Sequence, residues 1–317
     1  MLAPPQKVET ADFYLMTALR KAKQELNQVH FKTPYKLQKY KQLEKNRLRL
    51  LKQHLNPPLQ TLVKSYPSLD SLNEFYTQLT QATLDLSKLK KALATLHWAQ
   101  GKITELIKIY TYKIEKSTDL EQPKKQTQMC LGRIKSVLQR APLAYLEECR
   151  KIIRNYPTIK EIYTVSIAGF PNVGKSTLLS KLTTAKPEIQ SYAFTTKQLN
   201  IGYYVKHPYT LQIIDTPGTL NRFEKMNAIE QQAYLAMKYA SDLILYVYDL
   251  TETSYPLAQQ EKLHQHLLEL DKPLLIYLSK TDLLDSETIR QFLNKYPTAF
   301  YTIEQAKEQV LQQAKKH

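Results

Sequence analysis

The chain has 317 residues, enough for about two domains, and contains 43% hydrophobic and 23% charged residues. This composition excludes a mainly disordered protein, and no apolar run approaches the roughly 18 residues that a membrane helix needs. The start of the chain lacks a basic-then-apolar leader, so we expect neither export nor membrane insertion. Two cysteines, Cys130 and Cys149, cannot form a disulfide framework. We therefore predict reduced thiols and a cytoplasmic location.

The net charge is distributed unevenly along the chain. Residues 1–155 contain 28 Lys and Arg against 13 Asp and Glu, a net charge of +15. Residues 156–317 contain 17 and 16, a net charge of +1. Such asymmetry indicates that the first half binds a polyanion such as nucleic acid. The alternative is that its lysines are ordinary solvated helix faces.

The first half predicts a helical bundle over residues 1–156. Apolar residues recur at helical spacing in its first long segment: Leu37, Tyr40, Leu48, Leu51 and Leu55. A separate stripe of the same helix carries the candidate RNA contacts, Lys41, Lys45, Arg49 and Lys52. We expect Pro57-Pro58 to end this helix.

Further helices are expected between residues 84 and 155. Residues 84–117 contain no proline and one glycine, which favours a long helix. Residues 122–125 are interpreted as a polar break, followed by helices near 127–140 and 142–155. Trp98, the single tryptophan, is interpreted as a core or seam residue of the bundle, with base stacking as the alternative.

The second half, residues 157–317, alternates short β-branched or aromatic runs with amphipathic segments. This pattern predicts a mostly parallel six-stranded sheet with helices on both faces. The expected strands are Tyr163–Ala168, Leu199–Val205, Thr210–Asp215, Leu243–Asp249, Pro273–Ser279 and Thr298–Ile303. Only residues 206–209 separate the second run from the third, so these two are expected to form a hairpin.

A glycine-rich phosphate-binding motif follows the first expected strand. It runs from Gly169 to Ser176 as G-x-x-x-x-G-K-S and leads into a helix-forming stretch. Its backbone N–H groups and a helix N-terminus would surround the phosphates of a nucleotide. The candidate nucleotide-binding residues are Asn172, Val173, Gly174, Lys175, Ser176 and Thr177. Lys175 supplies charge at the outer phosphates, and the Ser176 hydroxyl is a candidate Mg²⁺ ligand.

Two downstream elements complete a candidate triphosphate site. Asp215 closes the third expected strand and could hold a Mg²⁺-bound water, and the Gly218 N–H could contact the γ-phosphate. A hydroxyl of Thr195 or Thr196 could complete the Mg²⁺ shell, although either could be an ordinary threonine at a strand entry.

Base choice is expected to rest on Ser279-Lys280-Thr281-Asp282, after the fifth expected strand. The Asp282 carboxylate can accept hydrogen bonds from N1–H and N2–H₂ of guanine, whereas adenine would leave it poorly paired. Lys280 is a further candidate nucleotide contact.

These motifs resemble those of a TRAFAC-class GTPase, and more narrowly the Obg-related nucleolar G-protein (Nog) family. The matching segments are AGFPNVGKSTLL, AKPEIQSYAFTTK, IIDTPGTLNR and NAIEQQAYLAMKYASD. The resemblance covers the second half, and the helical basic first half agrees with the family layout. It implies a GTPase that assists assembly of the large ribosomal subunit, in the short form typical of archaea.

The resemblance also implies residue roles. Family spacing favours Thr196 over Thr195 as the Mg²⁺ ligand. The usual Asn of the base motif is Ser279 here, and we expect this shorter side chain to lose a bridge to the phosphate loop and weaken binding by roughly 1–2 kcal/mol. The Ile303 N–H occupies the place of the last base contact.

Two family features bear on hydrolysis. The residue after Gly218, which orients the attacking water or is hydrophobic in relatives, is Thr219 here, so we expect slow intrinsic hydrolysis. Asn172 could help to bind K⁺, or it could only shape the turn.

Three functions remain open at this stage. The first is a GTP-driven switch in which the basic bundle docks on large-subunit rRNA or a pre-ribosomal particle. The second is an RNA-binding placeholder in which GTP is mainly structural. The third is a GTPase that recruits a protein partner, and in each case an activating protein could assist.

Overall fold

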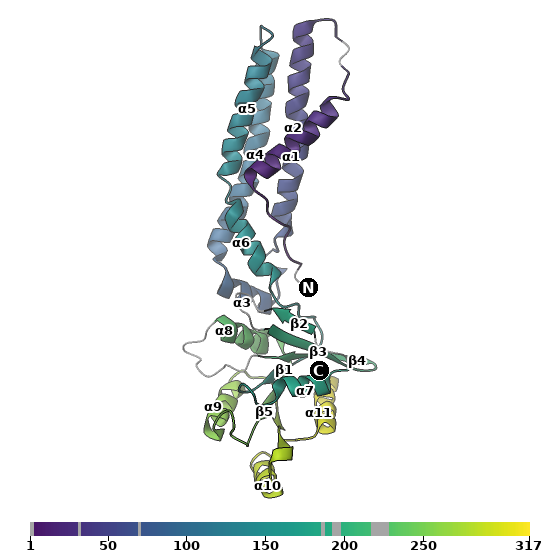
Figure 1. Ribbon diagram of the computed structural model, residues 1–317, viewed down its shortest axis with the longest axis vertical. Coiled ribbons are helices and arrows are strands. Elements are labelled where there is room, and N and C mark those ends of the chain that lie inside the picture. Colours follow the sequence, from purple (N-terminus) through teal and green to yellow (C-terminus); the bar gives the residue numbers. More distant parts are fainter. Residues whose placement is uncertain (1–2, 31–32, 69–70, 185–187, 192–197, 217–227) are drawn as a thin grey trace. The chain divides into compact units, whose positions relative to one another are not determined.

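The computed structural model of the chain describes residues 3–30, 33–68, 71–184, 188–191, 198–216 and 228–317 (Figure 1). The chain forms two compact units. One comprises Ala3–Ser71 and Thr80–Arg154, and the other comprises Leu72–Leu79 and Asn155–His317. None of the helices in the described ranges has the length and apolar character required to cross a membrane.

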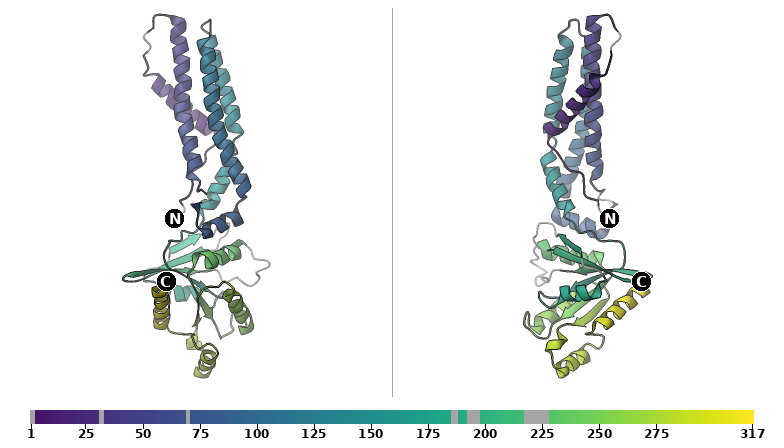
Figure 2. Two further views of the ribbon diagram at one scale, coloured as in Figure 1. Left: turned by 180° about the vertical axis from the view of Figure 1, so that it is seen from behind. Right: turned by 45° about the vertical axis from the view of Figure 1, so that its right-hand side comes forward.

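The first unit is the expected helical bundle. Its helices are α1 (Ala11–Leu26), α2 (Lys36–Ser65), α4 (Leu86–Glu115), α5 (Gln122–Gln139) and α6 (Leu143–Arg154), while α3 (Glu74–Thr83) crosses the boundary between the units. The long helices α2, α4 and α5 pack against one another, as Figure 2 shows. Leu48 and Leu51 of α2 and Leu96 and Ile103 of α4 are fully buried in this bundle. The bundle therefore forms by burying one apolar stripe of each helix.

The helix α2 continues through Pro57-Pro58, so the prediction that these prolines end it was wrong. Proline inside a helix removes a hydrogen bond and costs about 3 kcal/mol. Here Leu55, Leu59 and Leu62 keep the apolar stripe buried on both sides of the prolines. Burying three leucines contributes roughly 1.5–3 kcal/mol each, which is enough to carry the helix across the break.

Helix α5 begins earlier than expected, because residues 122–125 form its first turn. Pro123 lies at the start of α5, where its missing N–H costs nothing. The interpretation of these residues as a polar break was therefore wrong.

Trp98 is 48% exposed, so its interpretation as a core or seam residue of the bundle was wrong. It lies two positions after the buried Leu96 on α4, which places it about 200° around the helix from the packed stripe. The two cysteines are free and buried, as expected for reduced thiols. Burial raises the pKa of the Cys130 thiol to about 12, so it stays protonated at neutral pH.

The second unit is built on a six-stranded sheet with the order β2-β3-β4-β1-β5-β6. The strands are β1 (Thr164–Ala168), β2 (Glu188–Ser191), β3 (Gln198–Lys206), β4 (Tyr209–Asp215), β5 (Leu243–Tyr248) and β6 (Leu274–Leu278). The helical elements are α7 (Lys175–Leu182), α8 (Ala228–Leu235), the π-helix η3 (Ala236–Ala240), α9 (Leu257–Leu268), the 3₁₀ turn η4 (Thr281–Leu283), α10 (Ser286–Lys295) and α11 (Ile303–Lys316).

The topology explains where a ligand can bind in this unit. Strand β1 pairs in parallel with β4 on one side and with β5 on the other. The connection after β1 leads toward the β4 side and the connection after β5 leads toward β6, so right-handed crossovers place helices on both faces. The carboxyl end of β1 is therefore a topological switch point, where open sheets of this kind bind ligands.

The predicted sheet is confirmed in type, but not in every strand. The hairpin is confirmed, because β3 and β4 are antiparallel. Strand β2, which pairs antiparallel with β3, was missed. The expected last strand, 298–303, is reduced to a single bridge between Phe300 and Tyr277. It stops there because Thr302 caps α11 in a capping box with Gln305.

Residues 72–79 pack with the second unit, although the sequence division placed them in the first domain. The Tyr76 hydroxyl donates to the Pro157 carbonyl at 2.9 Å and accepts from the Ile159 N–H at 3.1 Å. Tyr76 is 3% exposed, so these hydrogen bonds lie away from water and fix the segment that leads into β1.

Candidate functional site

The loop between β1 and α7 has backbone angles that favour glycine. Gly169 has φ 146° and Gly174 has φ 98°, and Asn172 between them also lies in the left-handed region with φ 64°. A Cβ on Gly169 would lie 2.8 Å from the Val247 carbonyl oxygen of β5. Glycine is therefore required at residue 169 by both conformation and space.

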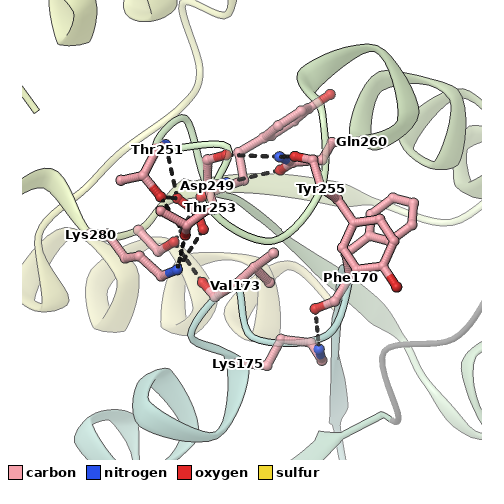
Figure 3. A network of polar contacts seen from close by, with 11 residues as sticks. Phe170, Val173, Lys175, Asp249, Thr251, Thr253, Tyr255, Gln260 and Lys280 are labelled. Atoms are coloured by element: carbon pink, nitrogen blue, oxygen red, sulfur yellow. Dashed lines mark hydrogen bonds and ion pairs between the residues drawn. The ribbon is translucent and has the colours of Figure 1, made fainter. Parts of the chain in front are cut away.

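Lys175 begins α7 and is 7% exposed. Its Nζ donates to the Phe170 carbonyl oxygen at 2.6 Å, so the ammonium lies at the mouth of the loop (Figure 3). Ser176 and Thr177 follow in the first turn of α7, and both are exposed. The structure thus joins the expected residues 169–177 in one loop at a helix N-terminus, a natural site for an anion.

Ser176 and Asp215 come together at the carboxyl ends of β1 and β4. The Ser176 hydroxyl donates to Asp215 Oδ2 at 2.6 Å. Asp215 is 6% exposed, and its Oδ1 is buried without a hydrogen-bond partner among the described residues. A hydroxyl beside a carboxylate with a spare oxygen is the kind of donor set that Mg²⁺ takes. The two residues therefore fit the expected metal.

Asn200 belongs to this cluster, although the sequence reasoning missed it. It is the partner of Asp215 in the β3–β4 ladder, and its Nδ2 donates to Asp215 Oδ2 at 3.2 Å. The signal that could have found it is a polar side chain in the hairpin opposite the motif aspartate.

Four expected residues cannot be placed. Thr195, Thr196, Gly218 and Thr219 lie outside the described residues. Thr216, the neighbour of Asp215, is described, and its hydroxyl donates to the Ile167 carbonyl of β1 at 2.7 Å.

Ser279 reaches the phosphate loop, so the expectation that it is too short was wrong. Its Oγ lies 2.6 Å from the Val173 carbonyl oxygen and 2.8 Å from the Tyr248 carbonyl oxygen. The short side chain suffices because the backbone of Ser279 is itself held against β5, its N–H donating to Tyr248 O at 2.9 Å. A Cβ on Gly174 would lie 3.6 Å from Ser279 Cβ, within ordinary van der Waals contact, so the loop is adjacent to the residue that follows β6.

Lys280 and Asp282 lie just beyond Ser279. Lys280 has φ 52°, and its Nζ forms an ion pair with Asp249 Oδ2 at 2.6 Å. Asp282 lies in η4 and is exposed, and its role as the guanine contact stays a prediction. Asp249 was missed as a site residue by the sequence reasoning. It directly follows β5 just as Ser279 directly follows β6, at the same edge of the sheet.

Ile303 is the first residue of α11, directly after the capping residue Thr302. Its side chain packs against the core of the second unit. Its role as a base contact stays a prediction.

The helical unit contains a basic groove between α2 and α4 of about 670 Å³. We call it the α2–α4 groove; it is lined by Gln42, Lys45, Asn46, Arg49, Lys52, Thr104, Ile107, Lys108 and Thr111. Three of the four candidate RNA contacts therefore share one concave surface, and α4 adds Lys108, which the sequence reasoning missed.

Glu115 at the end of α4 holds two of the candidate lysines. Lys41 Nζ donates to the Glu115 carbonyl oxygen at 2.7 Å, and Lys45 Nζ pairs with its carboxylate at 2.5 Å. The hydrogen bond from Lys45 lowers the pKa of the Glu115 carboxyl below its usual value. Arg49 Nε donates to Asn46 Oδ1, and this neutral amide does not compensate the positive charge of the arginine.

Comparison with known families matches both halves. Residues 2–160 match the NOG1 N-terminal helical domain, and residues 164–280 match a family described as 50S ribosome-binding GTPase. The second unit is thus a P-loop GTPase domain, which confirms the predicted fold and enzyme class. The chain as a whole belongs to the family of nucleolar GTP-binding protein 1.

Individual relatives cover most of the chain. An uncharacterized protein of Methanocaldococcus jannaschii is 34% identical over 88% of this chain and 80% of its own length. Nucleolar GTP-binding protein 1 of Drosophila melanogaster is 31% identical over 91% of this chain, and that of Arabidopsis thaliana is 33% identical over 81%. The chain spans only 44% and 39% of those two proteins. Among solved structures, the G domain of the T. maritima FeoB iron transporter is 25% identical, covering 48% of this chain and 98% of that domain, with a TM-score of 0.41.

The expected cytoplasmic location is contradicted by these relatives. Those from Drosophila, Arabidopsis and Saccharomyces cerevisiae are named nucleolar GTP-binding proteins, and this points to the nucleolus instead. A low cysteine content does not distinguish compartments inside a cell, so it could not have given this answer.

Proposed function

We propose that the chain is a GTP-driven switch that assists assembly of the large ribosomal subunit, with its basic helical unit docking on rRNA. The α2–α4 groove is the observation that carries this proposal. It gathers Lys45, Arg49, Lys52 and Lys108 on one surface of the half whose net charge is +15. The family names of the relatives support a ribosomal partner. Dense positive charge along a groove is the electrostatic footprint of a nucleic-acid site.

The nucleotide chemistry follows from the residues at the carboxyl edge of the sheet. Ser176 and Asp215 would hold Mg²⁺, Asp215 through a water, and the ion would neutralise charge on the β- and γ-phosphates. Lys175 would contact the outer phosphates, and Asp282 would select guanine. The Thr196 hydroxyl would complete the Mg²⁺ shell, and the Gly218 N–H would contact the γ-phosphate. Segments 194–197 and 216–225, which carry them, would order around the γ-phosphate and relax after hydrolysis.

Turnover without an activating partner is proposed to be slow. Thr219 is too short to orient the attacking water as a glutamine does, so transition-state charge would be stabilised mainly by Lys175, Mg²⁺ and backbone donors. Asn172, which has φ 64° and is exposed, is a proposed K⁺ ligand. Equal hydrolysis rates in K⁺ and Na⁺ would reject that role.

Binding of large-subunit rRNA at several salt concentrations tests the docking proposal. If several phosphates are neutralised, affinity should fall steeply with salt. Lys108→Ala should reduce the slope of log affinity against log salt by about 1, because it removes one phosphate contact. Lys102→Ala is the matched control, since Lys102 lies on the same helix but pairs with Glu105 outside the groove. A flat salt dependence would favour a protein partner instead.

Two further measurements separate the alternatives. Crosslinking to ribosomal particles with a GTP analogue and with GDP should give different contacts for a switch. Equal contacts, also with Asp215→Ala, would support the placeholder in which GTP is structural. Asp282→Asn should weaken GTP binding and strengthen binding of xanthosine triphosphate, and an unchanged preference would contradict the guanine assignment.

A further inference from the structure

A buried carboxylate at the end of β5 organises the segment that carries Asp282. Asp249 is 1% exposed, and both of its carboxylate oxygens are engaged (Figure 3). Oδ2 pairs with Lys280 Nζ at 2.6 Å. Oδ1 accepts from the Thr251 N–H at 3.0 Å and from the Thr251 hydroxyl at 2.6 Å. The carboxylate is therefore fixed in one orientation, with one oxygen turned toward Lys280.

Gln260 of α9 fixes the backbone of the same residue. Its Oε1 accepts from the Asp249 N–H at 2.9 Å, and its Nε2 donates to the Asp249 carbonyl oxygen at 2.7 Å. The same Nε2 donates to the Tyr255 carbonyl oxygen at 2.9 Å. Gln260 is fully buried, so water does not compete for these hydrogen bonds. Its single side-chain amide therefore connects the residue after β5 to α9.

Lys280 needs this support because its backbone is in an uncommon conformation. A φ of 52° is unfavourable for a residue with a side chain, and such a conformation persists only where its surroundings hold it. Ser279 is tied to Val173 and Tyr248 on one side, and the Lys280 ammonium is tied to Asp249 on the other. Asp282 follows two residues later in η4, so its position depends on both anchors.

We propose that Asp249 and Gln260 are positioning residues for guanine-nucleotide binding, and that they act through Lys280. This inference rests on the proposed assignment of guanine to Asp282. Breaking the ion pair releases the backbone of Lys280 and with it the carboxylate that meets the base. The base is common to both nucleotides, so the effect falls equally on GDP and GTP.

Calorimetric titration of the full chain with GDP and with GTP tests the proposal. Asp249→Asn preserves the shape of the side chain but removes its charge, so both affinities should fall by roughly tenfold, the size expected for a lost hydrogen bond to a charged group. Gln260→Glu, which cannot donate to the Asp249 carbonyl, should give a similar loss. Glu261→Gln is the matched control, because Glu261 is the next residue on α9 and its carboxylate pairs with Lys295. Its affinities should equal those of the wild type.

A double-mutant cycle with Lys280→Met separates positioning from a general structural role. If Asp249 acts through Lys280, Asp249→Asn adds no further loss of affinity in the Lys280→Met background. Thermal unfolding of the nucleotide-free variants shows whether each is folded. An undiminished loss in the Lys280→Met background would overturn the proposal, as would unchanged affinity of folded Asp249→Asn. A wild-type chain that binds no guanine nucleotide would instead overturn the proposed function, and this inference with it.

Discussion

Replacing Ser279 by alanine should weaken nucleotide binding through the phosphate loop. The single hydroxyl proton of Ser279 is shared between Val173 O at 2.6 Å and Tyr248 O at 2.8 Å. Tyr248 O keeps the Ser279 N–H as a donor, so the loss falls on the Val173 carbonyl inside the loop. One net hydrogen bond contributes about 0.5–1.5 kcal/mol. If the loop needs this bond to keep its binding conformation, GDP affinity falls about threefold to tenfold.

The measurement is calorimetric titration with GDP, together with thermal unfolding of the nucleotide-free chain. Ser180→Ala is the matched control. Like Ser279, Ser180 donates its hydroxyl to a backbone carbonyl, but this bond, to Thr177 O at 2.8 Å, lies within α7 on an exposed surface. Ser279→Asn should bind no more than threefold more tightly than the wild type, since the bridge to the loop already exists. Wild-type affinity in a folded Ser279→Ala variant would refute this account of the loop.

Two other predictions concern stability. Gly202→Ala should destabilise the chain by roughly 1–3 kcal/mol, because its Cβ would overlap the Thr183 methyl group. Adding Thr183→Ser removes that methyl group and should restore most of the lost stability. Chemical denaturation of the single and double variants measures the loss and the recovery. In the bundle, a hydrogen bond from Arg150 is the main cause that lowers the pKa of the Glu147 carboxyl from 4.5 to about 2. The folded state therefore binds fewer protons than the unfolded state in this range, so the stabilisation is complete above pH 4.5 and is lost as the pH falls toward 2. Denaturation midpoints of Glu147→Gln should lie below those of the wild type at neutral pH and approach them toward pH 2, and a constant difference would contradict this pH dependence.

The phosphate loop can be predicted from local sequence, but the residues from other elements that hold the site in place cannot. The spacing of Gly169, Gly174 and Lys175 encodes a turn whose φ angles only glycine adopts readily, so the loop could be predicted from adjacent residues. Asn200 and Asp249 join the site through strand pairing and helix packing, which bring together residues far apart in the chain. No spacing rule within a single motif reveals such contacts.

The errors in the helical unit have the same origin. Pro57-Pro58 is a strong local signal for a helix end, yet the buried leucines on both sides outweigh it. Trp98 is apolar, and a single aromatic residue does not reveal which way its helix faces. Tertiary packing overrides propensity in the first case, and in the second it decides an orientation that composition leaves open.

Glu115 gives the α2–α4 groove a counterion that belongs to the protein. In the proposed docking, a nucleic acid that reaches Lys45 would exchange with this carboxylate rather than displace dissolved ions alone. At Lys41 it would replace the Glu115 carbonyl oxygen. This exchange would weaken the binding of isolated anions, because a single small anion offers too little charge to compete with a carboxylate attached to the protein. If the proposed docking on rRNA is right, the number of cations released on binding would be smaller than the number of lysines that touch phosphate.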